Sequence, residues 1–202
     1  MKVAKQLGEL VEFMRNGTTT EQNQDGIGYP VTRIETISQG VVDSKRVRFV
    51  NLSDDGLAKW KVQVGDILFS HINSEEHIGK SALYEGQPAD LVHGMNLLLL
   101  RPAKDRVLPS FLHYLLRSTQ ARAYVRAHCN KAINQASINQ KELGAMQAMV
   151  PPLAEQAKVV DLLARAEGIV RLRREAATKA AELIPALFIH HFGDPATNPM
   201  GW

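Results

Sequence analysis

The longest periodic segment of the chain runs from Pro151 to Gly193, and it constrains the fold more than any other feature. Pro151 and Pro152 suit the first turn of a helix, so we expect a long helix to begin there. Pro185 removes a backbone donor and disfavours helical geometry before it, which predicts a kink or break near residues 182 to 185. Up to that point the helix would be about 48 Å long at about 1.5 Å per residue.

One face of this helix is apolar with the spacing of a coiled coil. Positions alternately four and three residues apart are apolar, with Arg173 the exception. The seam residues are Val159, Leu163, Ala166, Val170, Ala177, Ala180, Ile184 and Leu187. The opposite face mixes acidic and basic residues, so we interpret it as solvated. The stripe could fold back on the preceding domain as ordinary core, or pair with a second helix. Because a typical globular helix has only ~11 to 12 residues, we favour pairing.

Composition gives the broad class. The chain has 202 residues, of which 45% are hydrophobic and 22% charged, as in a soluble protein with a real core. No stretch approaches the ~18 apolar residues of a membrane span, and the first residues lack a signal-peptide core. Cys129 is the single cysteine, so no internal disulfide can form. We therefore expect a cytoplasmic protein with no membrane association.

The net charge is only +3, but the positive charge is unevenly placed. No acidic residue occurs between Asp105 and Glu142. The basic residues in that interval are Arg106, Arg117, Arg122, Arg126, Lys131 and Lys141, with His113 and His128. A surface of one sign most commonly meets a phosphate backbone, although a merely basic soluble helix remains an alternative.

Upstream of the long helix, the sequence predicts short strands and one helix. The expected strands lie at residues 29–34, 40–42, 47–50, 62–70, 82–84 and 95–102. A helix is expected to run from Ser110 to about Ala127, opened by Pro109. The predicted fold class is α+β: a globular domain at residues 1–150, a long coiled-coil-type helix at 151–192 and a tail at 193–202.

Catalytic motifs are missing from the sequence. It holds no glycine-rich nucleotide loop, no Walker lysine and no nucleophile elbow. His71 and His77, with Glu75 and Glu76 between them, do not have a recognised metal-ligand spacing. We therefore predict a non-catalytic chain that binds no metal or cofactor itself.

Three polar segments, at residues 15–26, 71–80 and 130–141, favour recognition instead. Asparagine and glutamine side chains pair with adenine edges in the major groove of DNA, while arginine and lysine pair with guanine or phosphate. Such residues read DNA best from loops on a rigid scaffold, which the preceding strands would supply.

Four stretches together resemble the DNA-specificity subunit of type I restriction-modification systems. They are Gly-Asp-Ile-Leu-Phe-Ser at 65–70, Ile-Asn-Gln-Ala-Ser-Ile-Asn at 133–139, Pro-Pro-Leu-Ala-Glu-Gln at 151–156, and the ending from Phe-Gly-Asp-Pro at 192–195 onwards. The resemblance covers essentially the whole chain, and the Pro-Pro-Leu-x-Glu-Gln opening is its most specific part.

The resemblance implies a target-recognition domain followed by a spacer helix. In that family the pair is usually repeated, the two helices pack antiparallel, and the two domains read the halves of a split DNA site. The implied partners are double-stranded DNA, methylation subunits that bind S-adenosylmethionine, and through them the restriction subunit. This chain holds one copy of the pair, so we predict an antiparallel homodimer that binds a palindromic site.

The resemblance and the polar segments together give a set of candidate DNA contacts. They are Asn134, Gln135, Asn139 and Lys141 first, then Asn73, His77 and Lys80, then Thr18, Thr19 and Asn23. Arg122 and Arg126 should act mainly through the salt dependence of binding. Two other functions stay open: an assembly or inhibitor protein that docks on methylation subunits through its helix without reading DNA, and an enzyme acting on nucleic acid.

Overall fold

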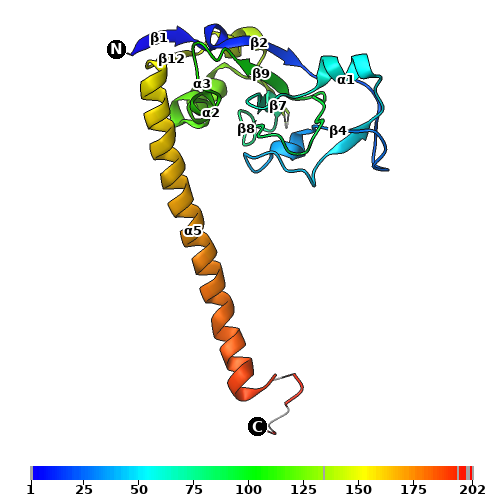
Figure 1. Ribbon diagram of the computed structural model, residues 1–202, viewed down its shortest axis with the longest axis vertical. Helices are drawn as coiled ribbons and strands as arrows, with labels where there is room; N and C mark the ends of the chain where they lie inside the picture. The colour runs from blue at the N-terminus through cyan, green and yellow to red at the C-terminus, as the bar shows by residue number, and fades with distance from the viewer. Residues whose placement is uncertain (1, 134, 195, 199–200, 202) are drawn as a thin grey trace. The chain divides into compact units, whose positions relative to one another are not determined.

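The computed structural model describes residues 2–133, 135–194, 196–198 and 201 (Figure 1). It divides into two compact units, Met1–Lys158 and Val159–Trp202. The division lies inside the long helix α5 (Leu153–Phe192), a few residues beyond the boundary that the sequence predicts at residue 150. The first turn of α5 belongs to unit 1 because Gln156 is completely buried there.

A four-stranded antiparallel sheet forms the centre of unit 1. Its order is β2 (Val11–Asn16), β9 (Leu98–Pro102), β6 (Ile67–Phe69) and β8 (Ser81–Leu83). Side chains alternate between its faces, so Leu98 and Leu100 join one apolar cluster and Leu97 and Leu99 another. The first cluster includes Leu112 and the rest of the buried face of α2 (Pro109–Arg117).

Three smaller sheets surround this centre. At the chain's start, β1 (Val3–Gln6) lies antiparallel beside β12 (Gln147–Val150) (Figure 1). The second sheet has the order β10 (Asn130–Ala132), β11 (Gln135–Ser137), β7 (Ile72–Asn73), and the third β3 (Gln22–Asn23), β5 (Arg48–Val50), β4 (Tyr29–Val31). The helix α1 (Asp54–Trp60) packs Leu57 and Trp60 against the third sheet. The remaining elements are the 3-10 helices η1 (Leu7–Leu10) and η2 (Ile34–Ile37) and the helices α3 (Thr119–His128) and α4 (Gln140–Gly144).

The predicted α+β class is confirmed, with local corrections. Residues 40–42 are bends and irregular backbone rather than a strand, and within the predicted stretches 29–34 and 62–70 the strands are limited to β4 and β6. The single helix expected from Ser110 to Ala127 is two helices, because Ser118 has extended backbone geometry and its Oγ caps α3 by accepting from the amide of Ala121 at 3.1 Å. The sequence analysis also missed α1, whose N-cap is Ser53.

The opening motif of the long helix serves as an anchor in unit 1. Gln156 Oε1 accepts from the amide of Leu108 at 2.8 Å, and Gln156 Nε2 donates to the carbonyl oxygens of Arg106 and Pro151 at 3.0 and 2.8 Å. One buried amide thus satisfies three backbone groups of two separate segments. This explains why glutamine stands at the end of the Pro-Pro-Leu-Ala-Glu-Gln motif.

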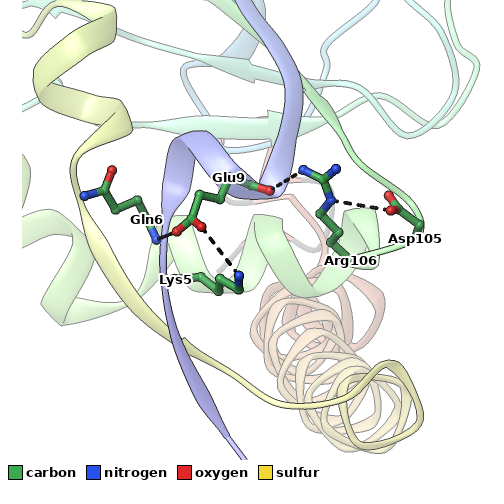
Figure 2. A network of polar contacts seen from close by, with 5 residues as sticks. All are labelled: Lys5, Gln6, Glu9, Asp105 and Arg106. Carbon is green, nitrogen blue, oxygen red and sulfur yellow. Dashed lines mark hydrogen bonds and ion pairs between the residues drawn. The ribbon is translucent and has the colours of Figure 1, made fainter.

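The loop that Gln156 holds is also tied to η1 (Figure 2). The guanidinium of Arg106 donates to the carbonyl oxygen of Glu9 at 3.0 Å and pairs with Asp105 at 3.4 Å. The Glu9 carboxylate in turn accepts from the amide of Gln6 at 2.7 Å and pairs with Lys5 at 3.5 Å. The hydrogen bond from Gln6 lowers the pKa of Glu9, because it favours the charged form. The N-terminal segment and the start of α5 therefore share one polar framework.

Helix α5 has 40 residues, which corresponds to about 60 Å. It continues through Pro185 to Phe192, so the predicted break is wrong. The missing amide removes one hydrogen bond, while the turns on both sides keep theirs. All eight predicted seam residues are exposed, including Leu163 and Ile184. Among the described residues, no helix is long and apolar enough to cross a membrane.

Unit 1 holds one histidine whose burial makes its folding sensitive to acid. His93 is completely buried, and its Nε2 lies 3.2 Å from the carbonyl oxygen of Arg15, to which Nε2–H donates. Its Nδ1 has no hydrogen-bond partner among the described residues. Burial lowers the pKa of His93 to about 4 from an ordinary value of 6.5, because the charged imidazolium would lose its hydration.

We expect this histidine to make unit 1 less stable in acid. Below pH 6.5, His93 binds a proton in the unfolded chain but stays neutral in the folded chain. The free energy of unfolding therefore falls as the pH falls from 6.5 towards 4. Between about pH 7 and about pH 4.5, His93 should lower the free energy of unfolding by about 2 kcal/mol. Urea denaturation at both pH values measures this loss. His93→Gln should show a smaller loss than the parent and than the exposed control His190→Gln; an unchanged loss in His93→Gln contradicts the assignment.

Candidate nucleic-acid interface

Two of the three predicted polar segments meet in one small sheet. Strand β11 pairs with β7, with Ala136 opposite Asn73 and Ser137 opposite Ile72. The amide of Ile138 also donates to the carbonyl oxygen of His71 at 2.9 Å. These pairings bring residues 71–80 and 130–141 side by side. The third segment, residues 15–26, belongs to another part of unit 1, where β3 pairs with β5.

Two helices flank the β10–β11 hairpin along the chain. Helix α3 ends at His128, just before the hairpin, and α4 begins at Gln140, just after it. Tyr124 connects them, because its hydroxyl donates to the carbonyl oxygen of Glu142 at 2.9 Å. The ring of Tyr124 also stacks on His128 with centroids 3.9 Å apart. We use the name α3–α4 face for the exposed residues of α3, the hairpin and α4 taken together.

Three cations of the α3–α4 face have no acidic partner among the described residues. Arg122, Arg126 and Lys141 are exposed, and none of the three makes a side-chain hydrogen bond or ion pair with the described residues. Exposed cations that lack counter-charges bind polyanions at little cost, because no internal contact has to be broken. Lys131, in β10, is different: it forms an ion pair with Glu75, and this contact raises the pKa of Lys131.

The amide residues predicted to read bases separate into two groups. Gln135 is exposed, and its side chain makes no hydrogen bond with the described residues, so its amide is available to a ligand. Asn139 instead caps α4, with Oδ1 accepting from the amide of Glu142 at 2.8 Å. Asn73 Oδ1 accepts from the amide of Ser74, and Asn73 Nδ2 donates to Ser70 Oγ. Asn134 lies outside the described residues.

The weaker candidates are mostly engaged within unit 1. Asn23 holds its own loop through the carbonyl of Ile27 and the amide of Asp25. Lys80 Nζ donates to the carbonyl oxygen of Ser38 at 2.9 Å. Thr18 is only 4% exposed, with its hydroxyl bonded to that of Thr20, whereas Thr19 is exposed.

The histidines of residues 71–80 are partly or fully buried. In the described part of the chain, no group of three or more His, Cys, Asp or Glu side chains is placed to hold a metal ion. His77 is half-buried, and its Nδ1 and that of His71 have no hydrogen-bond partner among described residues. Burial also lowers the pKa of His71, which keeps its ring neutral.

Sequence reasoning missed two residues of the α3–α4 face. Lys131 was noted only as part of the acid-free stretch, and its place opposite Glu75 depends on the pairing of β11 with β7. Ile133 lies in the turn directly after β10 and is 95% exposed. A large apolar residue directly before two amide residues was the available signal.

Comparison with known proteins identifies the family. The family described as type I restriction modification DNA specificity domain matches residues 2–179. A putative type I restriction enzyme MjaX specificity subunit from Methanocaldococcus jannaschii is 46% identical over 167 residues, which are 82% of this chain and 39% of that protein. The EcoKI specificity subunit of Escherichia coli K12 is 31% identical over 153 residues, 75% of this chain and 33% of that protein. The chain thus spans about two fifths or less of these relatives' length.

Solved structures support the same fold. A chain from a study of complex assembly and conformational transition of the type I R-M system matches with a TM-score of 0.65 and 20% identity, over 92% of this chain and 43% of that one. The HsdS subunit from Thermoanaerobacter tengcongensis matches with a TM-score of 0.60 and 16% identity, over 96% of this chain and 50% of that one. Since the family match covers most of the residues, this chain belongs to the type I restriction modification DNA specificity domain family.

Proposed function

We propose that this chain recognises a DNA sequence for a type I restriction-modification enzyme and has no catalytic activity of its own. Unit 1 reads the DNA, and the α3–α4 face makes the contact. The observation that carries this proposal is the set of exposed, unpaired cations Arg122, Arg126 and Lys141 around a hairpin that presents the free amide of Gln135. Cations of this kind hold phosphates, and amides of this kind read base edges.

The proposal includes the partners that such a role requires. Methylation subunits, carrying S-adenosylmethionine, dock on the chain and bring the restriction subunit to a split DNA site in the cytoplasm. The exposed apolar stripe of α5 pairs antiparallel with that of a second copy, through Val159, Leu163, Ala166 and the rest of the seam. A two-fold dimer presents two identical recognition units, so the bound site is palindromic.

A second function is favoured by the same stripe. A chain that docks on methylation subunits through α5, without reading DNA, would act as an assembly or inhibitor protein. The exposure of the seam supports protein binding in both cases, so the stripe alone does not separate the two functions. DNA sequence selectivity separates them, because only the first function requires it.

Selection from a library of random duplexes tests the proposed function. The purified chain, alone and with its methylation subunits, is incubated with the library, and the bound duplexes are sequenced over several rounds. Enrichment of one short sequence supports recognition. Equal recovery of all sequences, together with binding to the methylation subunits, supports the docking function and overturns the proposal.

Two substitutions on the α3–α4 face should affect DNA binding differently. Gln135→Ala removes a base contact, so it should cost about 1 to 3 kcal/mol of discrimination between the selected duplex and a scrambled one. Lys141→Ala removes a phosphate contact, so it should weaken both duplexes alike and flatten the salt dependence of binding. Fluorescence anisotropy at several salt concentrations measures both effects. If both variants bind DNA as the parent does, the DNA-binding surface is not the α3–α4 face.

A further inference from the structure

Ile133 is the most exposed of the large apolar side chains in the described chain, at 95%. The other large apolar side chains of the hairpin's surroundings are buried or lie on other elements, and among the described apolar residues of the hairpin only the small side chain of Ala132 is exposed beside Ile133. Its strand neighbours on the two sides of the turn, Lys131, Ala132 and Gln135, offer it no apolar cover. Such a residue contributes nothing to the core, and its exposure to water carries a cost.

The hairpin that presents Ile133 is firmly held at its base. Ala136 and Ile138 are each only 1% exposed and belong to the main apolar cluster of unit 1. Strand β11 is hydrogen-bonded to both β10 and β7. The ion pair of Lys131 with Glu75 joins β10 to the segment that follows β7. The base of the hairpin is therefore fixed, while Ile133 is exposed to solvent.

The surroundings of the hairpin match one kind of partner. The residues before and after it along the chain include Arg126 and Lys141, which are exposed and make no ion pair with described residues. Only Ala136 and Ser137 of the hairpin pair with β7, so the part at Ala132 and Gln135 is two-stranded. A two-stranded β-ribbon is narrow enough to enter the major groove of B-form DNA, where nearby cations can meet the phosphates. In that groove, the 5-methyl group of thymine is the one apolar group that base pairs present.

We propose that the β10–β11 hairpin enters the major groove and that Ile133 contacts the 5-methyl group of a thymine in the target. This inference rests on the proposed function and names a determinant of its specificity. The contact removes both apolar groups from water, which stabilises the complex only where thymine stands at the right position. Ile133 thereby reads one base pair by shape, beside the hydrogen bonds that Gln135 makes.

The test removes the methyl group from the DNA and the side chain from the protein. In the duplex selected from the random library, each thymine is replaced in turn by deoxyuridine, which keeps base pairing and loses only the 5-methyl group. At one position the parent chain should bind the deoxyuridine duplex roughly fivefold to tenfold more weakly. Ile133→Ala should bind both duplexes of that pair equally. The control Ile27→Ala removes another exposed isoleucine, 63% exposed and outside the hairpin, and should keep the parent's sensitivity.

Each outcome has a definite meaning. Equal sensitivity to deoxyuridine in Ile133→Ala and the parent overturns the inference, as does a selected sequence without thymine. The fluorescent base 2-aminopurine, placed in the bound site, becomes brighter when neighbouring bases unstack. If the parent raises this fluorescence and Ile133→Ala does not, Ile133 inserts between base pairs, and the inference is overturned. If no sequence is enriched from the library, the proposed function itself fails. Because Ile133 makes no core contact, the variant should match the parent in thermal unfolding.

Discussion

Replacing Leu163 with glutamate is expected to turn a dimeric chain into a monomer. Leu163 lies in the middle of the first half of the apolar stripe and is 37% exposed in the isolated chain. In a two-fold interface the substitution would bury two unpaired carboxylates, and each costs several kcal/mol. That penalty exceeds what the remaining side chains of a single helix pair can offset.

Light scattering at micromolar concentration measures the result. The parent and the control Lys179→Glu, which changes a charge on the opposite face, should have the mass of two chains, and Leu163→Glu the mass of one. A parent that is monomeric, or a Leu163→Glu variant with unchanged mass, contradicts the dimer. If the parent is a monomer that binds methylation subunits completely, the apolar stripe of α5 is their binding surface.

Replacing Arg101 with leucine is expected to lower the free energy of unfolding of unit 1 by about 3 kcal/mol. Arg101 Nε and Nη2 donate to the two carboxylate oxygens of Asp66 at 2.8 and 2.7 Å, and Asp66 is 2% exposed. Asp66 Oδ2 also accepts from the amide of Gln63 at 2.8 Å. The hydrogen bonds to Asp66 raise the pKa of Arg101. Without the guanidinium, a charged carboxylate stays buried and loses its main partner.

Urea denaturation compares this buried pair with an exposed one. Lys61 pairs with Asp90 at 2.6 Å, and both side chains are 47% exposed, so Lys61→Leu should destabilise unit 1 much less than Arg101→Leu does. The double variant Asp66→Asn with Arg101→Leu removes the buried charge and should recover part of the loss. A double variant as unstable as the sum of its two single variants would show that the two residues do not act as a pair.

The long helix could be predicted from the sequence because its periodicity is local and uninterrupted. The continuity of α5 through Pro185 could not be predicted, since whether a proline interrupts a helix depends on the turns around it rather than on proline alone. The break between α2 and α3 at Ser118 also escaped prediction, because serine occurs both inside helices and at their caps. Strands such as β6 and β9 were found from their short apolar runs.

The candidate DNA contacts were harder to predict from the sequence than the secondary structure. Asparagine is preferred at helix N-caps and in turns for the same hydrogen bonds that suit it to base edges. The sequence therefore ranked Asn139 with Gln135, and the structure separates them, because Asn139 caps α4 while Gln135 has its amide free. Ile133 escaped notice because an apolar residue is assigned to the core by default. Its exposure follows only from the pairing of β10 with β11.

A structure of the chain bound to its selected duplex would locate the DNA-binding surface without any intermediate assumption. We expect the α3–α4 face to meet the DNA, with Gln135 at a base edge in the major groove and Arg122, Arg126 and Lys141 near phosphates. A complex in which this face points to solvent, and the DNA lies against the β3–β5–β4 sheet instead, would contradict it.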